Sequence, residues 1–268
     1  MIKLIFSDMD GTLLDDDNRL PEGFDDMMGE LRERGVRFCP ASGRQYFSLR
    51  STFRDYADEF LFLAENGAMV VQGGHEIFSV TLPKEEVLRV LEEGMKLPGI
   101  LSVFSGKENA YILRSQESPE CIAAFEWYYS RSKVVENFAE VEETAVKASF
   151  FDMKGHADQT IYPFLDHLNR EGFRVLFGSN HWVDVLHGDV NKGNAIRWIQ
   201  KQFGISPMEC AAFGDYLNDR EMMSAVHYSF AMANAHPDIK QAARFETASN
   251  QEGGVLAGIR RLMDEGLV

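Results

Sequence analysis

Two aspartates near the N-terminus, Asp8 and Asp10, directly follow the short apolar segment KLIFS. This segment has the length of one buried strand, and in a parallel α/β sheet ligands bind beyond the carboxyl ends of the strands. Gly11 allows a sharp turn there, and the Thr12 hydroxyl is suited to hold the turn by a hydrogen bond. Two carboxylates this close repel each other unless a cation or a shared proton compensates. Mg²⁺ fits, because it takes oxygen ligands and often binds through one or two carboxylates plus a phosphate.

Three later segments carry polar residues that complement this carboxylate pair. PASGR and NKGNA each stand where a helix is predicted to start, and they supply Ser42, Gly43, Arg44 and Lys192. A hydroxyl and free backbone N–H groups at a helix start suit a phosphate oxygen, and a lysine there places a positive charge on a phosphate. In the third segment, FGDYLND, Asp215 ends a predicted strand, where its carboxylate would be a further ligand for the cation.

The acidic N-terminal segment does not have the pattern of a calcium-binding loop. An EF-hand requires D-x-[DN]-x-[DN]-G and a glutamate at position twelve. Counted from Asp8, the glycine falls at the fourth position, Thr12 occupies the third ligand position and Arg19 the twelfth. The three aspartates at 15–17 lie past the turn and are predicted to form a solvated loop, and the seven histidines show no metal-ligand spacing.

The elements that must position these residues alternate between strand and helix at both ends of the chain. Helices are predicted over residues 21–34 and 44–57, in KGNAIRWIQKQFG and in GGVLAGIRRLMDEG, and short apolar strands stand between them. Repeated βα units predict a doubly wound, Rossmann-like parallel sheet, formed by residues 1–82 and 187–268. In residues 83–186 strands follow strands, with helices predicted over 84–96, 118–131 and 157–171, which predicts an inserted α+β domain with hinges at Pro83 and HGDVN.

Composition narrows the class of protein. The net charge of −15 and the isoelectric point near 4.9 argue against a nucleic-acid binder and against binding to anionic lipid. Three widely spaced cysteines without a CxxC pattern favour reduced thiols in a cytoplasmic protein. No apolar stretch reaches the length of a membrane span, and MIKLIF lacks the long apolar region of a signal peptide.

The segments DMDGTLL, SGR, KG and GDYLND, in this order, resemble the four motifs of the haloacid-dehalogenase-like hydrolase superfamily. The insertion between the second and third motifs resembles the type IIB cap of the Cof-like phosphatases, and ENGA at 65–68 resembles a stretch common in that subfamily. The resemblance covers the whole chain. Four motifs in the right order and spacing are much more specific than any one of them.

The resemblance implies a two-step phosphoryl transfer. Asp8 would be the nucleophile and Asp10 the general acid and then the general base. Mg²⁺ would be held by the carboxylates of Asp8 and Asp215 and the backbone carbonyl of Asp10. The phosphoryl group would be held by Ser42, the Gly43 amide, Lys192 and Asn218. Asp219 would orient Lys192 or a metal-bound water and, like Thr12, would support the site from its surroundings.

Substrate selection is expected from the last residue of SGR and from residues outside the four motifs. The candidates for substrate contact are Arg44, Asn66, Asn180 and His181, the last two because SNHW lies at a predicted hairpin tip of the cap. Tyr216 stands where many relatives carry a small residue, and it is expected to change loop packing or pocket shape but not the reaction. The predicted substrate is a small phosphate ester such as a sugar phosphate, and the predicted state is a monomer or weak homo-oligomer.

Two other functions remain open at this stage. A phosphomutase shares this core and a similar cap, and it returns the phosphoryl group to a sugar instead of to water. A receiver-type signalling domain also combines aspartates, a hydroxyl and a lysine around Mg²⁺. Such domains have roughly 120 residues in total, whereas here Lys192 follows Asp8 by more than 180 residues with a whole domain between them.

Overall fold

The computed structural model describes the backbone of all 268 residues and every side chain except those of Ala124 and Trp127. Its contacts form two compact units. The core unit comprises Met1–Ser42, Phe53–Ile77 and Asn191–Val268, and the cap unit comprises Gly43–Thr52 and Phe78–Val190. The chain passes between the units after residues 42, 52, 77 and 190, and each unit is described by itself below.

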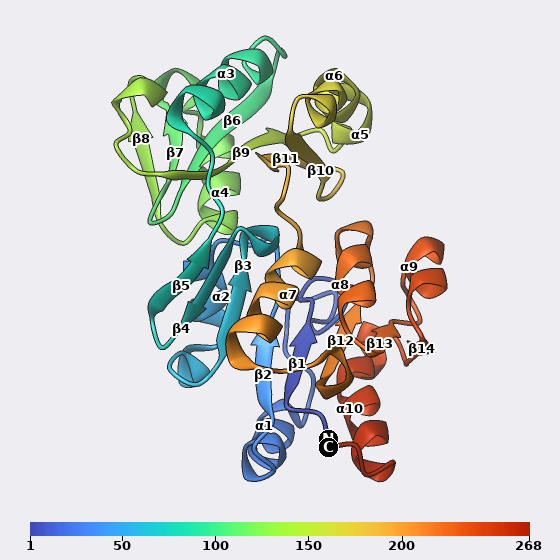
Figure 1. The fold of residues 1–268 in the computed structure, drawn as a ribbon. Coiled ribbons are helices and arrows are strands. Elements are labelled where there is room, and N and C mark those ends of the chain that lie inside the picture. The colour runs from blue at the N-terminus through green and yellow to red at the C-terminus, as the bar shows by residue number, and fades with distance from the viewer. The chain divides into compact units, whose positions relative to one another are not determined.

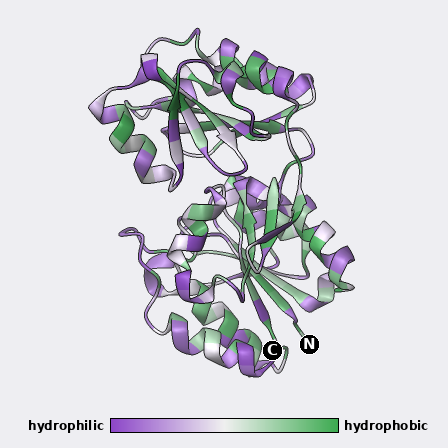
Figure 2. Ribbon diagram, turned by 90° about the vertical axis from the view of Figure 1, so that its left-hand side faces the viewer, coloured by the Kyte–Doolittle hydropathy of each residue, from purple (hydrophilic) through white to green (hydrophobic). Residues whose placement is uncertain are grey.

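The core unit is built on a five-stranded parallel sheet in the order β14-β13-β12-β1-β2 (Figure 1). The strands are β1 (Leu4–Ser7), β2 (Arg37–Pro40), β12 (Cys210–Gly214), β13 (Tyr228–Ala231) and β14 (Phe245–Glu246). Every residue of β1 and β12 is buried, and hydrophobic colour runs through the strands of this sheet in Figure 2. Such continuous apolar strands are typical of a parallel sheet covered on both faces. The predicted doubly wound α/β core is confirmed.

A second sheet of the order β3-β4-β5 extends this framework. Its strands are β3 (Leu61–Ala64), β4 (Met69–Gln72) and β5 (His75–Ser79). β3 pairs antiparallel with β4, and a parallel bridge joins Leu63 of β3 to Ala41, just after β2. β3 therefore continues the line of parallel strands beyond β2 by a single bridge.

The core helices are α1 (Phe24–Glu33), α7 (Lys192–Phe203), α8 (Arg220–Ala225), α9 (Pro237–Ala242) and α10 (Gly254–Asp264). α1 buries residues at the spacing of one helix face, which are Phe24, Met27, Met28 and Leu31. The sequence predicts its start at Pro21, which is wrong, because Gly23 adopts the left-handed conformation (φ 80°) and the helix begins after it. α7 ends at Gly204, also left-handed (φ 62°), as predicted.

The cap unit contains a six-stranded mixed sheet in the order β10-β11-β9-β6-β7-β8. The strands are β6 (Ile100–Gly106), β7 (Ala110–Leu113), β8 (Ser132–Val135), β9 (Ala145–Asp152), β10 (Phe173–Phe177) and β11 (Trp182–His187). Neighbours pair antiparallel except β7 and β8, which are parallel. The helices of this unit are α2 (Tyr46–Thr52), α3 (Lys84–Gly94), α4 (Pro119–Tyr128), α5 (Ala157–Thr160) and α6 (Tyr162–Leu165).

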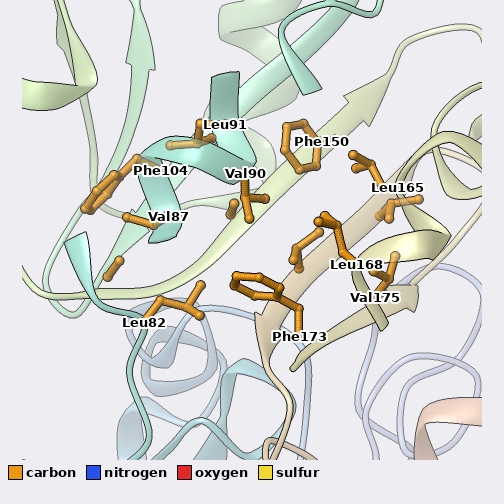
Figure 3. Packing of buried hydrophobic residues seen from close by; sticks show 14 of the residues in the cluster. Leu82, Val87, Val90, Leu91, Phe104, Phe150, Leu165, Leu168, Phe173 and Val175 are labelled. Carbon is orange, nitrogen blue, oxygen red and sulfur yellow. The ribbon is translucent and has the colours of Figure 1, made fainter. Parts of the chain in front are cut away.

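One apolar cluster joins α3, α5 and α6 to one face of this sheet. Val87, Val90 and Leu91 of α3 pack with Phe104 and Phe150 of the sheet, and the cluster continues to the residues around α6 (Figure 3). The single helix predicted over 157–171 is wrong. The segment is broken into α5, α6 and a 3₁₀ turn (Asp166–Arg170), because the proline at position 163 lacks an N–H and its ring clashes with the carbonyl four residues earlier.

No helix in the part of the chain that the structure describes is long and apolar enough to cross a membrane.

Candidate functional site

The parallel register of the core sheet brings three of the predicted motifs to one edge. Ser7 of β1 lies level with Phe213 of β12 and with Pro40 of β2. The amide of Asp8 donates to the Phe213 carbonyl at 2.9 Å, so Asp8 continues the β1–β12 ladder by one residue. The residues that follow the three strands are Asp8, Ala41–Ser42 and Asp215. They therefore meet at the carboxyl edge, where an α/β sheet binds its ligands.

Lys192 joins two of the predicted aspartates by charge-assisted hydrogen bonds. Its Nζ donates to Asp8 Oδ1 at 2.5 Å and to Asp219 Oδ1 at 2.6 Å, and its side chain is fully buried. The lysine is the first residue of α7, whose start is capped by Asn191 Oδ1 accepting from the Asn194 amide at 2.7 Å. A fully buried ammonium must be paired to be tolerated, and here two carboxylates fix its position beside Asp8.

Asp219 also fixes the loop that carries Asp215. Its second oxygen, Oδ2, accepts from the backbone amides of Asp215 at 3.0 Å and Tyr216 at 3.3 Å. A methyl group added at Gly214 would lie 2.6 Å from that same oxygen, so the loop closes tightly around the carboxylate. Tyr216, whose effect on the pocket the sequence left open, packs edge-on against His236 with ring centroids 6.0 Å apart.

The turn after Asp8 is tied to Asp215. Thr12 Oγ1 donates to Asp215 Oδ1 at 2.7 Å, and Thr12 is itself buried. Gly11 has a φ of 76°, and a Cβ there would lie 2.5 Å from Asp215 Oδ2, so only glycine fits. Asn234, which no sequence motif singles out, donates from Nδ2 to the Gly11 carbonyl at 2.8 Å and holds the turn from its other side.

A second chain of contacts links Ser42, Asn66 and Asn218. The Asn66 amide donates to the Ser42 carbonyl at 2.9 Å, and Asn218 Nδ2 donates to Asn66 Oδ1 at 3.1 Å. Glu65 and Asn66 both adopt positive φ values, 52° and 56°, which is uncommon for residues other than glycine. Two consecutive left-handed residues are a local strain of the kind that functional sites retain. Glu65 is buried, and neither its burial nor its left-handed backbone was predicted from the sequence.

Three carboxylates of the site have the arrangement of a metal-binding group. Oxygen atoms of Asp8, Asp215 and Asp219 all lie within 4.8 Å of one another. With the three carboxylates ionised, the Lys192 ammonium leaves an excess of two negative charges, which a divalent cation would neutralise. Hard oxygen donors suit Mg²⁺. Asp10 lies outside this group of the described residues; its side chain is exposed, and the predicted contact of its backbone carbonyl with a metal stays a prediction.

Burial sets the ionisation of these groups in the metal-free protein. Burial raises the pKa of Asp8 well above its ordinary value, and Asp219 raises it further, while Lys192 opposes the shift. Burial and then Asp219 raise the pKa of Asp215 to about 6, against the hydrogen bond from Thr12. Burial alone would lower the pKa of Lys192, but the carboxylates of Asp219 and Asp8 raise it overall, so the lysine stays charged.

Replacing Asp215 with asparagine is expected to change how the stability of the metal-free protein depends on pH. The folded pKa of about 6 exceeds the ordinary value of 3.8, so the folded state holds a proton that the unfolded state releases. The free energy of unfolding therefore falls as pH rises from about 4 to above 6, by about 3 kcal/mol from this group. In EDTA, thermal melts across this range should show a smaller loss of Tm for Asp215→Asn than for wild type. Parallel pH profiles would contradict the assignment.

The remaining candidates belong to the cap unit. Gly43 and Arg44 follow Ser42 in the chain but group with the cap unit by their contacts. Asn180 is exposed, and its carbonyl accepts from the Ala157 amide at 2.8 Å. The His181 ring stacks on Phe151 with centroids 5.5 Å apart, and its Nδ1 lies 2.7 Å from the Asp152 carbonyl oxygen. The role of Gly43 in phosphate binding and those of Arg44, Asn180 and His181 in substrate contact stay predictions.

The three aspartates beyond the turn have local partners. Asp15 Oδ1 accepts from the amides of Asp17 at 2.9 Å and Arg19 at 2.8 Å, which closes a small turn. Asp16 Oδ1 accepts from Asn250, and Asp17 pairs with the Arg19 guanidinium at 3.2 Å while both remain exposed. These three aspartates therefore stabilise the loop by local hydrogen bonds and an exposed ion pair.

Comparisons with known proteins identify the family of the chain. Residues 5–259 match the family model described as haloacid dehalogenase-like hydrolase. The chain is 35% identical over 269 residues to 5-amino-6-(5-phospho-D-ribitylamino)uracil phosphatase YbjI of Escherichia coli, covering 98% of this chain and 96% of the relative. It is 27% identical over 241 residues to an HMP-PP phosphatase of Klebsiella pneumoniae, covering 90% and 87%.

Solved structures share the fold along the full chain. SMU.1108c of Streptococcus mutans superposes with a TM-score of 0.88 at 26% identity, covering 98% of this chain and 100% of that one. The HAD subclass IIB sugar phosphatase BT4131 superposes with a TM-score of 0.80 at 23% identity, covering 99% and 100%, which shows the same fold. The family model spans residues 5–259, and the YbjI match covers 98% of the chain. The chain therefore belongs to the haloacid dehalogenase-like hydrolase family.

Proposed function

We propose that the chain is a Mg²⁺-dependent phosphatase that hydrolyses a small phosphorylated metabolite through an aspartyl-phosphate on Asp8. The chain is a phosphoric monoester hydrolase by its family and its phosphatase relatives; the proposal concerns its metal, mechanism and substrate. The observation that supports it most is the buried Lys192 ammonium between Asp8 and Asp219, beside Asp215 at the carboxyl edge of the sheet.

The metal-binding residues in this proposal are Asp8, Asp215 and the Asp10 backbone carbonyl, with Asp219 close by. When bound, Mg²⁺ would offset the carboxylate charge and polarise the phosphoryl oxygens. Lys192 supplies a second, permanent positive charge next to the Asp8 carboxylate. Together they allow a dianionic phosphate to approach a cluster of carboxylates in a protein whose net charge is −15.

In the first step an Asp8 carboxylate oxygen attacks phosphorus, and the bond from phosphorus to the ester oxygen breaks. Asp10 donates a proton to the departing oxygen, so the leaving group departs as an alcohol. Ser42, the Gly43 amide, Lys192 and Asn218 hold the transferring phosphoryl group by hydrogen bonds and charge. The Asn66 contacts to Ser42 and Asn218 support two of these groups from one side.

In the second step Asp10, now a carboxylate, takes a proton from a water molecule that attacks phosphorus. The bond from phosphorus to Asp8 breaks, inorganic phosphate is released, and both aspartates return to their starting states. The exposure of Asp10 fits this exchange, because the group must meet a leaving group and then water. Asp8 is buried, so little bulk water competes with the phosphate ester for its carboxylate.

The relatives suggest which phosphate esters to test first. The YbjI relative is named for 5-amino-6-(5-phospho-D-ribitylamino)uracil, and another relative for HMP-PP. We place the ribitylaminouracil phosphate first, followed by sugar phosphates. The cap unit is proposed to select the leaving group, with Arg44, Asn180 and His181 as its candidate contacts and Asn66 of the core unit as a further one. The working state is a monomer or weak homo-oligomer.

A substrate panel tests this proposal. With Mg²⁺, the chain is expected to release inorganic phosphate from 5-amino-6-(5-phospho-D-ribitylamino)uracil. Its kcat/KM should be at least about tenfold above that for an aryl phosphate, because only the ribitylaminouracil ester carries polar groups that the cap can bind. Release of phosphate and free alcohol in equal amounts would support a phosphatase. An isomeric phosphate ester without free phosphate would instead indicate a phosphomutase and would contradict the proposal.

A further inference from the structure

A buried ion pair in the cap unit contacts the backbone of a proposed phosphate-binding residue. Lys147 of β9 is 3% exposed. Its Nζ donates to Asp184 Oδ2 of β11 at 3.0 Å and to the backbone carbonyl of Gly43 at 3.0 Å. Ser149 Oγ donates to the other Asp184 oxygen at 2.6 Å. All four residues belong to the cap unit, whereas Ser42, the neighbour of Gly43 in the chain, belongs to the core unit.

The sheet register explains why these side chains meet. Ser149 of β9 pairs directly with Asp184 of β11, and Lys147 lies two residues from Ser149, so the side chains of both point to the same face of the sheet. A buried lysine without partners would be very costly, and Asp184 supplies the opposite charge. An ion pair of this kind often gives no net stability compared with apolar residues of similar size. Stability alone therefore does not account for the pair, whereas its contact with Gly43 suggests a role.

We infer that Lys147 is a positioning residue that holds the phosphate-binding loop at Ser42–Gly43 in its binding conformation. The inference rests on the proposed function, in which the Ser42 hydroxyl and the Gly43 amide bind the phosphoryl group. Lys147 acts through the Gly43 carbonyl and does not itself need to touch the substrate.

The geometry of the peptide bond gives the physical reason. Gly43 has no side chain, so its backbone torsions are among the least restricted in the chain. The peptide unit is planar and trans, so the Ser42 carbonyl held by Asn66 sets the direction of the Gly43 amide, and the Gly43 carbonyl held by Lys147 sets the following peptide unit, which together restrict both backbone torsions of Gly43. Ser42 is held independently, since its amide donates to the Leu63 carbonyl and its carbonyl accepts from the Asn66 amide, both at 2.9 Å. Gly43 is thus fixed on both sides.

The residues after Gly43 share the same attachment to the cap unit. Gln45 Oε1 accepts from the Arg131 amide at 3.2 Å, and Ser48 Oγ donates to the Tyr128 carbonyl at 3.2 Å. The Arg131 guanidinium lies over the Phe47 ring, 3.5 Å from its centroid. The segment Gly43–Thr52 therefore belongs to the cap by several contacts, and Lys147 is the charged contact at its first residue.

The test uses the inhibition constant of inorganic phosphate, which reports the phosphate-binding loop directly. The double variant Lys147→Met, Asp184→Asn removes the ammonium without leaving a buried unpaired charge, and the amide oxygen introduced at position 184 still accepts from Ser149. Loss of one charge-assisted hydrogen bond that orients the loop is expected to raise the inhibition constant roughly tenfold. The single variant Ser149→Ala is the control; it alters the same buried cluster but keeps the Lys147 ammonium, its partner Asp184 and its contact with Gly43, and it should change the constant by less than about twofold.

The two roles of Lys147 predict different readouts. A purely structural role lowers the fraction of folded enzyme, which reduces the apparent kcat and Tm but leaves the inhibition constant of the folded molecules unchanged. An inhibition constant within about twofold of wild type in the double variant, measured well below its Tm, would overturn the inference. Should the double variant not fold, Lys147→Gln with Asp184→Asn gives the same test, because the shorter amide does not span the distance to Gly43.

Failure of this inference is distinguishable from failure of the proposed function. A wild-type protein that releases phosphate from esters, combined with an unchanged double variant, contradicts the role of Lys147 alone. A wild-type protein that neither releases phosphate from esters nor binds inorganic phosphate contradicts both.

Discussion

Replacing Asp8 with asparagine is expected to lower kcat for hydrolysis of an aryl phosphate by about four orders of magnitude or more. The amide is a very poor nucleophile, so no covalent intermediate forms, while the Lys192 and Asp219 contacts that shape the site remain. The measurement is phosphate release under saturating Mg²⁺ with a purified variant free of wild-type protein.

Asp17→Asn is the matched control, because it makes the same chemical change in an exposed residue nine positions later in the same segment. It should keep wild-type kcat. The fold of Asp8→Asn should survive, since the substitution removes a carboxylate whose pKa burial and neighbouring acids raise. Turnover by Asp8→Asn within about tenfold of wild type would refute the nucleophile assignment.

Removal of divalent metal with EDTA is expected to lower kcat by at least about a hundredfold, and added Mg²⁺ should restore it. Without a cation, the carboxylates of Asp8, Asp215 and Asp219 repel an incoming phosphate dianion, and the single Lys192 ammonium does not balance them. The measurement is phosphate release after dialysis against EDTA and again after Mg²⁺ is returned.

EDTA saturated beforehand with Mg²⁺ is the control, because it contains the chelator without its capacity to remove metal. It should leave activity unchanged. Full turnover after exhaustive chelation, with no metal detected in the protein, would show that the three carboxylates serve another purpose and that the Mg²⁺ proposal is wrong.

The meeting of Asp8 and Asp215 was predictable because both residues directly follow short apolar strands. Once Asp8 and Asp215 are assigned to the ends of parallel strands, the architecture of the sheet brings them together without further information. Lys192 was predictable for a related reason: it begins a helix after a polar cap, and a helix start is a common anion site. In the structure its ammonium contacts both Asp8 and Asp219, and the distances of these contacts could not be predicted from the sequence.

The hydrogen bonds that support the site could not be predicted from the sequence, because they join residues far apart in the chain. Asn66 and Asn218 meet across 152 positions, and Asn234 meets Gly11 across 223. Lys147 lies within the strand pattern VKASFFD, where an isolated lysine looks like an exposed position. Only the register between β9 and β11 shows that Asp184 is its partner. The first residue of a helix was not predicted correctly either: α1 begins after Gly23 and not at Pro21.

The most direct test of the proposed mechanism is to trap the covalent intermediate on Asp8. Enzyme mixed with a phosphate ester and Mg²⁺, quenched in acid within the first turnovers and digested, should give one peptide that gains the mass of a single phosphoryl group. Fragmentation should place that group on Asp8, and the Asp8→Asn variant should gain none. A phosphoryl group on another residue, or hydrolysis at full rate with no labelled peptide at any quench time, would contradict a mechanism through aspartyl-phosphate.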